Sequence, residues 1–140
     1  EKYPALRGME ILAQLTDAEI WELVNASSWS RLPAQSVILR ENEPGQSLFF
    51  LTSGQVKVTK QGHLLSTLRG GEWLGEMSYI RGGALPRQAT VESLTDVVIA
   101  EFKNAALERL SDSCQLHFAR ALMRTLVDRL ALANIRMSQV

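Results

Sequence analysis

The chain has 140 residues, of which 46% are hydrophobic and 21% are charged. This length fits one domain, and this composition excludes a disordered tail, a collagen-like fibre and a disulfide scaffold. The 15 Lys and Arg residues balance the 15 Asp and Glu residues, so the net charge gives no support for a dedicated binder of nucleic acid or of a membrane surface.

Three features of the sequence bear on membrane insertion, cellular location and whether the chain is part of a longer protein. The longest stretch without a charged residue, 44–56, is shorter than the roughly 18–20 apolar residues that cross a bilayer, so we expect no membrane segment. Cys114 is the only cysteine, so no internal disulfide can form and a cytoplasmic, reducing location fits best. The first residue is Glu and no signal peptide follows, which predicts a piece of a longer protein.

The chain is predicted to be helical from about Met9 to Ser27. Apolar residues recur there at helical spacing, at Ile11, Leu12, Leu15, Ile20, Trp21, Leu23 and Val24. Thr16 is a suitable N-cap, and Glu19 three residues later completes a capping box. We therefore expect two short helices with a break near Thr16.

Short strands are predicted after an extended stretch that ends at Pro33. Turn residues separate segments at 36–40, 47–52, 55–60, 63–68, 88–93 and 97–101. Val56 and Val58 alternate with Lys57 and Thr59, so this strand has one buried face and one exposed face. Seven or eight strands at this spacing predict a sandwich or a jelly roll.

The last part of the chain, from residue 103, is predicted to be helical again. A short helix covers 103–110, and Ser111 is a suitable N-cap for a long helix that ends near residue 138. A heptad seam in this long helix consists of Leu116, Ala119, Met123, Leu126, Leu130, Ala133 and Met137. The seam favours self-association, although a second apolar set leaves packing within the domain open: Phe118, Leu122, Leu132 and Ile135. The arginines of this helix are expected to form a solvated face: Arg120, Arg124, Arg129 and Arg136.

Residues 74–91 combine a carboxylate and a guanidinium in a pattern suited to a sugar phosphate. They read Leu-Gly-Glu-Met-Ser-Tyr-Ile, a loop with two glycines, and then Pro-Arg-Gln-Ala-Thr-Val. Gly75 permits close approach of a ligand, and Glu76 opens a helical turn whose free N–H groups favour an anion. Arg87 is able to pair with a phosphate through two parallel hydrogen bonds. The two charged groups on one wall would hold a hydroxyl and a phosphodiester together.

This stretch resembles the phosphate-binding cassette of cyclic nucleotide-binding domains. That family includes the catabolite activator protein and the regulatory subunits of cyclic-nucleotide-dependent kinases, and its pattern is roughly Phe-Gly-Glu-(Leu/Met)-(Ala/Ser), a loop, and Pro-Arg-X-Ala-(Thr/Ser)-Val. The resemblance implies one mainly β domain, an eight-stranded jelly-roll barrel with flanking helices. N-terminal helices would cover 1–27, the barrel 28–102 with the cassette at 74–91, and a hinge helix and C-terminal lid or dimer helix 103–140.

The resemblance also implies roles for individual residues. Glu76 would accept a hydrogen bond from the ribose 2′-hydroxyl, and Arg87 would pair with the phosphate oxygens. Backbone N–H groups of Gly75, Met77 and Ala89 would line the sugar phosphate. Ser78, Gln88 and Thr90 are further candidates for ligand contact. Leu65, Val56 and Leu74 would form the apolar wall beside the purine. Asn134, on the last helix, would cap the purine.

Two positions depart from the family pattern. The aromatic residue that usually precedes the cassette glycine is Leu74 here, with Trp73 one place earlier, which is expected to alter packing more than binding. Guanine-selective members often carry Thr where this chain has Gln88, and Gln88 by itself favours neither base. The expected ligand is cAMP, with cGMP as the alternative. No cofactor is expected beyond that ligand, and two histidines with one cysteine are too few for a clustered metal site.

These features predict a cyclic nucleotide sensor rather than an enzyme. The expected partners are the nucleotide, a second copy through the C-terminal helix, and an effector outside this chain. One alternative is a barrel that has lost its ligand and serves only for dimerisation. Another is the sensor half of a transcription regulator, but no helix-turn-helix follows within this chain, so we expect no contact with nucleic acid from it.

Overall fold

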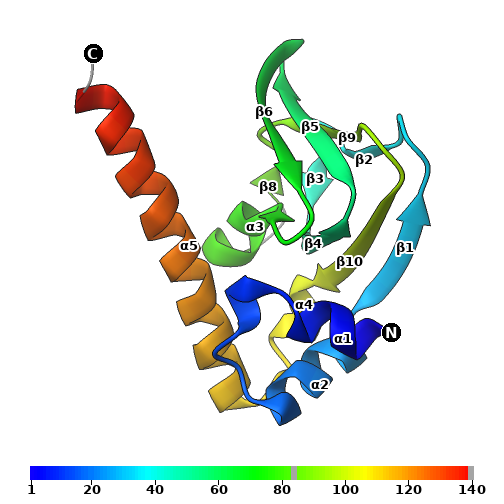
Figure 1. Cartoon of the computed structure of the whole chain (residues 1–140), viewed down its shortest axis with the longest axis vertical. Coiled ribbons are helices and arrows are strands. Elements are labelled where there is room, and N and C mark those ends of the chain that lie inside the picture. The colour runs from blue at the N-terminus through cyan, green and yellow to red at the C-terminus, as the bar shows by residue number, and fades with distance from the viewer. Residues whose placement is uncertain (83–84, 139–140) are drawn as a thin grey trace.

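Two four-stranded antiparallel sheets form the body of the domain (Figure 1). The computed structural model describes residues 1–82 and 85–138, with side chains up to residue 132 in the last helix. The first sheet has the order β1 (Ser28–Leu32), β10 (Val97–Lys103), β4 (Ser47–Ser53) and β7 (Trp73–Leu74). The second has the order β2 (Val37–Leu39), β9 (Thr90–Ser93), β5 (Gln55–Lys60) and β6 (His63–Arg69), and a ribbon pairs β3 (Pro44–Gly45) with β8 (Leu85–Pro86).

This arrangement confirms the predicted mainly β sandwich with flanking helices. The described strands form three separate sheets, so a closed eight-stranded barrel is not confirmed. The three two-residue strands β3, β7 and β8 lack the length that makes a periodic pattern visible in a sequence. Pro44 and Gly45, which lie between the predicted segments at 36–40 and 47–52, pair with Pro86 and Leu85.

Helices precede, interrupt and follow the strands. Those before the sheets are α1 (Lys2–Arg7), the 3-10 turn η1 (Glu10–Leu12) and α2 (Asp17–Ala26), and the later ones are α3 (Glu76–Arg81), α4 (Asn104–Leu107) and α5 (Asp112–Ser138). The predicted capping box at Thr16 and Glu19 is confirmed, with both of its hydrogen bonds present. Helix α1 lies within the predicted N-terminal helical segment 1–27. It shows no helical spacing of its own, because six residues are too few to reveal the period.

Strand β4 is buried on both faces and separates two cores. Leu48 and Phe50 pack with the N-terminal helices and α5, whereas Phe49 and Leu51 pack with the second sheet. Successive side chains of a strand point to opposite faces, so a strand between two cores needs a continuous apolar run. The Leu-Phe-Phe-Leu sequence of β4 meets that requirement.

Helix α5 begins in the core and then extends away from the body (Figure 1). Cys114, Phe118 and Leu122 are buried at its beginning. Of the predicted seam, Leu116, Met123 and Leu130 are 49%, 56% and 61% exposed. The side chains of Ala133, Ile135 and Met137 lie outside the described residues. The described part of the second apolar set that packs within the domain is therefore Phe118 and Leu122.

A buried carboxylate joins α5 to α2. Glu19 is 3% exposed, and its Oε2 lies 2.8 Å from Nδ1 of His117. Its Oε1 accepts the backbone N–H of Thr16 at 2.8 Å. The side chain that caps α2 therefore also holds the first turns of α5.

None of the helices in the described part of the chain combines the length and apolarity that a membrane span requires.

Candidate functional site

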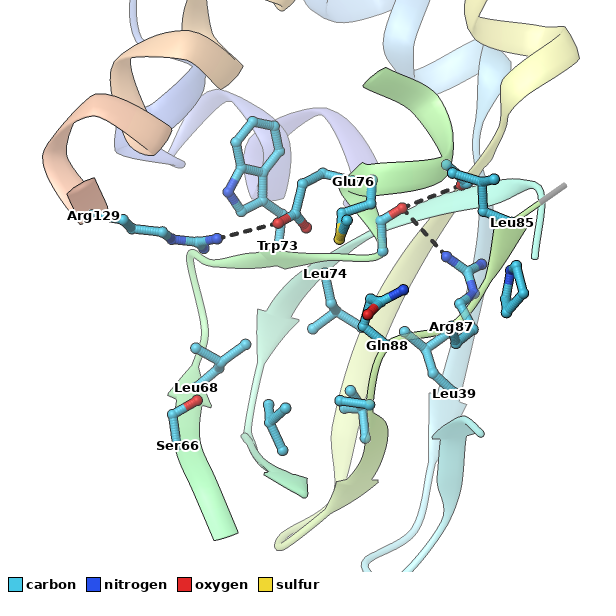
Figure 2. A pocket seen from close by; sticks show the side chains of 17 residues that line it. Leu39, Ser66, Leu68, Trp73, Leu74, Glu76, Leu85, Arg87, Gln88 and Arg129 are labelled. Atoms are coloured by element: carbon cyan, nitrogen blue, oxygen red, sulfur yellow. Dashed lines mark hydrogen bonds and ion pairs between the residues drawn. The ribbon is translucent and has the colours of Figure 1, made fainter. Parts of the chain in front are cut away.

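A cavity of about 330 Å³ opens between the second sheet, the segment from β7 to α3, and α5 (Figure 2). This volume lies within the range of roughly 300–1,000 Å³ typical of small-molecule sites. Apolar side chains form its floor: Leu39, Val58, Leu68, Leu74 and Val91. The charged groups on its walls are Glu76, Arg87 and Arg129. An apolar floor with a few convergent charges suits a ligand that has one flat apolar part and one anionic part.

Arg87 is fixed by backbone groups from two other elements. Its Nη2 donates to the carbonyl of Ser47 at 2.9 Å, and its Nη1 donates to the carbonyl of Gly75 at 3.3 Å. The guanidinium also lies over the ring of Phe49, 6.0 Å from its centroid. Two of the five N–H groups of the guanidinium are occupied in this way. The arginine therefore has a defined orientation and keeps donors for an anion.

Two glycines leave room for this guanidinium. A Cβ added at Gly45 would collide with the guanidinium of Arg87, and one added at Gly75 would lie 2.7 Å from its Nη1. Gly75 also has a φ of +77°, a left-handed conformation that residues with a side chain rarely adopt. The sequence Leu-Gly-Glu thus positions Arg87 through the glycine as well as presenting the glutamate.

Burial and nearby carboxylates act in opposite directions on Arg87. Burial lowers the pKa of the Arg87 guanidinium, and the charges of Glu101 and then Glu76 oppose that shift. The net effect is a pKa below the ordinary arginine value. Arginine stays charged in proteins even so, and a half-buried guanidinium is a strong partner for an anion.

Glu76 faces α5 at the other end of the cavity. Its Oε1 lies 3.5 Å from Nη1 of Arg129, and the side chain of Glu76 is 17% exposed (Figure 2). Arg129 was expected on a solvated face, and this expectation is wrong, because its side chain lines the cavity. Phe118, Leu122 and Arg129 are spaced by four and seven positions and therefore share one face of α5. This spacing could have predicted that Arg129 lies on the side of α5 that faces the domain.

Seven of the predicted site residues line the cavity together. They are Gly75, Glu76, Met77, Ser78, Arg87, Gln88 and Ala89. Leu74 also lines it, whereas Val56 is fully buried in the core between the sheets. The side chain of Asn134, the predicted purine cap, lies outside the described residues.

Two predicted residues are not among those that line the cavity. The β5–β6 register pairs Val58 with Ser66 and Thr59 with Leu64, so Leu65 is an extra residue at a bulge and is 58% exposed. Ser66 and Leu68 line the cavity in its place. Thr90 precedes Val91, whose side chain points into the core, so the alternation of β9 turns Thr90 away. Its Oγ1 accepts the backbone N–H of Glu41 at 3.0 Å.

Trp73 and Cys114 both belong to the core under the helices. Trp73 is 1% exposed and lies against Phe50 with ring centroids 5.9 Å apart, in the core under the helices. Burial raises the pKa of the Cys114 thiol to about 12, which makes that thiol a poor nucleophile. Within residues 1–82 and 85–138, no three His, Cys, Asp or Glu side chains are grouped so that they could hold a metal ion.

Comparison with known proteins assigns this geometry to a family. The family model of the cyclic nucleotide-binding domain matches residues 29–114, which is more than half of the chain. The chain belongs to the cyclic nucleotide-binding domain family.

Two curated relatives and one solved structure illustrate the similarity. The chain is 33% identical over 106 residues to a cAMP-dependent protein kinase regulatory subunit of Debaryomyces hansenii, covering 75% of this chain and 23% of that protein. It is 36% identical over 93 residues to the cGMP-dependent protein kinase egl-4 of Caenorhabditis elegans, covering 66% of this chain and 12% of that protein. A cyclic nucleotide-binding domain from Methylobacillus flagellatus superposes with a TM-score of 0.84 at 21% identity, covering 96% of this chain and 81% of that one, and thereby supports the fold.

Proposed function

We propose that the chain binds a cyclic nucleotide, with cAMP as the preferred ligand, and that binding alters the position of α5. The observation that carries this proposal is the half-buried guanidinium of Arg87, fixed at the cavity wall by Ser47 and Gly75 with donors to spare. The names of the two curated relatives, one a cAMP-dependent and one a cGMP-dependent kinase protein, support a cyclic nucleotide. We assign the chain a regulatory role and no catalytic one, with its effector outside the given sequence.

The charges of the cavity suit the two polar parts of such a ligand. Arg87 would pair with the phosphate, and Glu76 would accept a hydrogen bond from the ribose 2′-hydroxyl. The purine would lie on the apolar floor that β2, β5, β6 and β9 provide. Each hydrogen bond to a charged group contributes about 1.5–3 kcal/mol, so these two contacts account for much of the expected affinity.

The ion pair between Glu76 and Arg129 connects the cavity to α5. A ribose hydroxyl that donates to Glu76 would compete with Arg129 for the same carboxylate. Arg129 would then be released or would turn onto the ligand, and either change shifts the docking of α5. A ligand shifts such an equilibrium only through contacts that differ between the two states, and this shared carboxylate provides one.

Thermal unfolding tests the proposal directly. The melting temperature is measured with saturating cAMP, cGMP or 5′-AMP and without ligand. A ligand at about 100 times its dissociation constant stabilises the fold by about 2.7 kcal/mol, which corresponds to several degrees in a domain of this size. We expect the largest rise with cAMP and none with 5′-AMP. Equal melting temperatures in all four samples, with bound nucleotide excluded by absorbance, would refute the proposal.

The exposed side chains of α5 favour a second function, dimerisation through this helix. Leu116, Met123 and Leu130 recur every seven residues and are about half exposed or more. This spacing is self-complementary in a coiled coil, so a second copy of the chain is the proposed partner. Light scattering should show a dimer that Leu130→Glu dissociates. The control is Leu64→Glu, which alters an equally exposed leucine on β6. A monomeric wild-type chain would contradict dimerisation.

A further inference from the structure

Ser47 forms hydrogen bonds with two charged side chains, the guanidinium of Arg87 and the carboxylate of Glu101. Its carbonyl accepts from Nη2 of Arg87 at 2.9 Å, and its Oγ donates to Oε2 of Glu101 at 2.6 Å. Ser47 is 8% exposed, and a hydroxyl–carboxylate bond of this length is typical of a charge-assisted interaction. One buried residue thus holds the guanidinium and the Glu101 carboxylate in a single arrangement.

Glu101 and Phe49 lie on the same face of the first sheet, and Arg87 lies over the ring of Phe49. In the antiparallel pairing of β10 with β4, Glu101 is directly opposite Phe49. Directly opposite residues place their side chains on one face, and Arg87 covers the Phe49 ring on that face. The charge of Glu101 also raises the pKa of Arg87 more than the charge of Glu76 does. Both the register and the electrostatics therefore place a negative charge beside Arg87.

We infer that Glu101 is a fixed negative charge that weakens the binding of a ligand phosphate by Arg87. The inference rests on the proposed function, because it concerns the anionic part of the cyclic nucleotide. A phosphate that approaches Arg87 enters the field of Glu101, and in a half-buried site this repulsion is screened less than at the surface. The charges of Arg87 and Arg129 are balanced by those of Glu76 and Glu101, so these four groups together contribute no net positive charge at the cavity. Glu101 is therefore an affinity-limiting residue.

The substitution Glu101→Gln separates charge from position. The amide oxygen of glutamine still accepts the hydrogen bond from Ser47 Oγ, so Arg87 keeps its place while the negative charge is removed. We expect cAMP to bind about three- to tenfold more tightly at low salt. The gain should shrink when the salt concentration rises from about 0.05 M to about 1 M, because screening removes charge effects but not packing effects.

Two further variants show whether the charge itself is responsible. Glu10→Gln removes the same charge from η1, on the helical side of the first sheet, and should leave the affinity unchanged. Ser47→Ala breaks the hydrogen bond but keeps the charge of Glu101, and it should give no gain in affinity. A gain in Ser47→Ala equal to that in Glu101→Gln would overturn the inference, because release of Ser47 would then explain both.

Titration calorimetry with cAMP distinguishes this inference from the proposed function. Wild-type chain that binds no cyclic nucleotide refutes the proposed function and the inference with it. Wild-type chain that binds, while Glu101→Gln binds equally or more weakly, refutes the inference alone. If circular dichroism shows that Glu101→Gln is unfolded, Glu101→Ala removes the same charge and must show the same salt-sensitive gain.

Discussion

Arg87 is held at one end of the cavity by two backbone carbonyls and an aromatic ring, whereas Glu76 at the other end meets α5 through one ion pair of 3.5 Å. The first end depends on main-chain groups of two elements, which move little when a side chain changes. The second depends on the ends of two side chains, one of them 39% exposed. The Arg87 end, which is the proposed phosphate end, is therefore preorganised, and the α5 end is the part that we expect a ligand to rearrange.

The largest effect is expected when the phosphate end loses its cation. Arg87→Ala leaves a ligand phosphate largely unpaired in a half-buried site, so affinity for cAMP should fall about a hundredfold. Titration calorimetry measures this loss. The matched control is Arg31→Ala, which removes an exposed arginine from β1 and should bind as the wild type does. Unchanged affinity in Arg87→Ala would remove the phosphate end from the proposed site.

A smaller loss is expected when Arg87 is displaced but not removed. The Cβ of Gly45→Ala would collide with the guanidinium, whose flexible stem allows it to swing away. We expect roughly tenfold weaker binding of cAMP with a nearly unchanged melting temperature, since about 1.4 kcal/mol corresponds to tenfold. Gly8→Ala, at the C-cap of α1, is the control for the added methyl group. Unchanged affinity of Gly45→Ala for cAMP would show that binding does not require the observed position of the Arg87 guanidinium.

The α5 end should respond less to the loss of its charge. Arg129→Ala breaks an ion pair that is partly exposed, and such pairs contribute about 0–1 kcal/mol to stability. We expect binding of cAMP to weaken by only a few-fold, roughly the effect of one weak polar contact. Arg124→Ala removes an exposed arginine from the same helix and provides the comparison by calorimetry. A loss as large as that of Arg87→Ala would show that both ends are equally important for affinity.

The smallest effect concerns the beginning of α5 and depends on pH. Burial raises the pKa of Glu19, but hydrogen bonds with the Thr16 N–H, His117 and Ser113 together lower it by more, so the net pKa lies below the ordinary glutamate value. A carboxylate with a depressed folded-state pKa stabilises the protein above its unfolded value, and this contribution is lost as the pH falls through the folded value. The melting temperature of Glu19→Gln should therefore fall less than that of the wild type on acidification below about pH 4.5.

The control is Glu10→Gln, which removes an exposed carboxyl from η1 and should follow the wild type. Parallel curves for Glu19→Gln and the wild type would show that Glu19 does not anchor α5 through its charge.

The parts of the fold and site that could be predicted are those with local signals. The Thr16 capping box and the run of residues from Gly75 to Ala89 are short, and their meaning depends on adjacent positions. The continuous apolar run of β4 is also a local signal, but the elements that cover one of its faces come from both ends of the chain and could not be predicted from that run. Whether a closed barrel forms depends likewise on pairing between distant strands.

Arg129 and Leu65 show two other reasons for failure. Arg129 meets Glu76 across 53 positions of sequence, a contact that no local motif records. Leu65 lies at a bulge, and one extra residue in a strand changes which side chains face the cavity. The helical period could have predicted the position of Arg129 at the cavity, whereas no residue near Leu65 indicates a bulge.

The double role of Glu19 has a consequence for following α5 in solution. The Thr16 amide is bonded to the same carboxylate that contacts His117. If α5 left α2, Glu19 would lose its contact with His117 and become a solvated side chain, so the Thr16 amide would lose protection as well. The hydrogen-exchange rate of the Thr16 amide, near the N-terminus, would therefore measure how often the C-terminal helix α5 detaches.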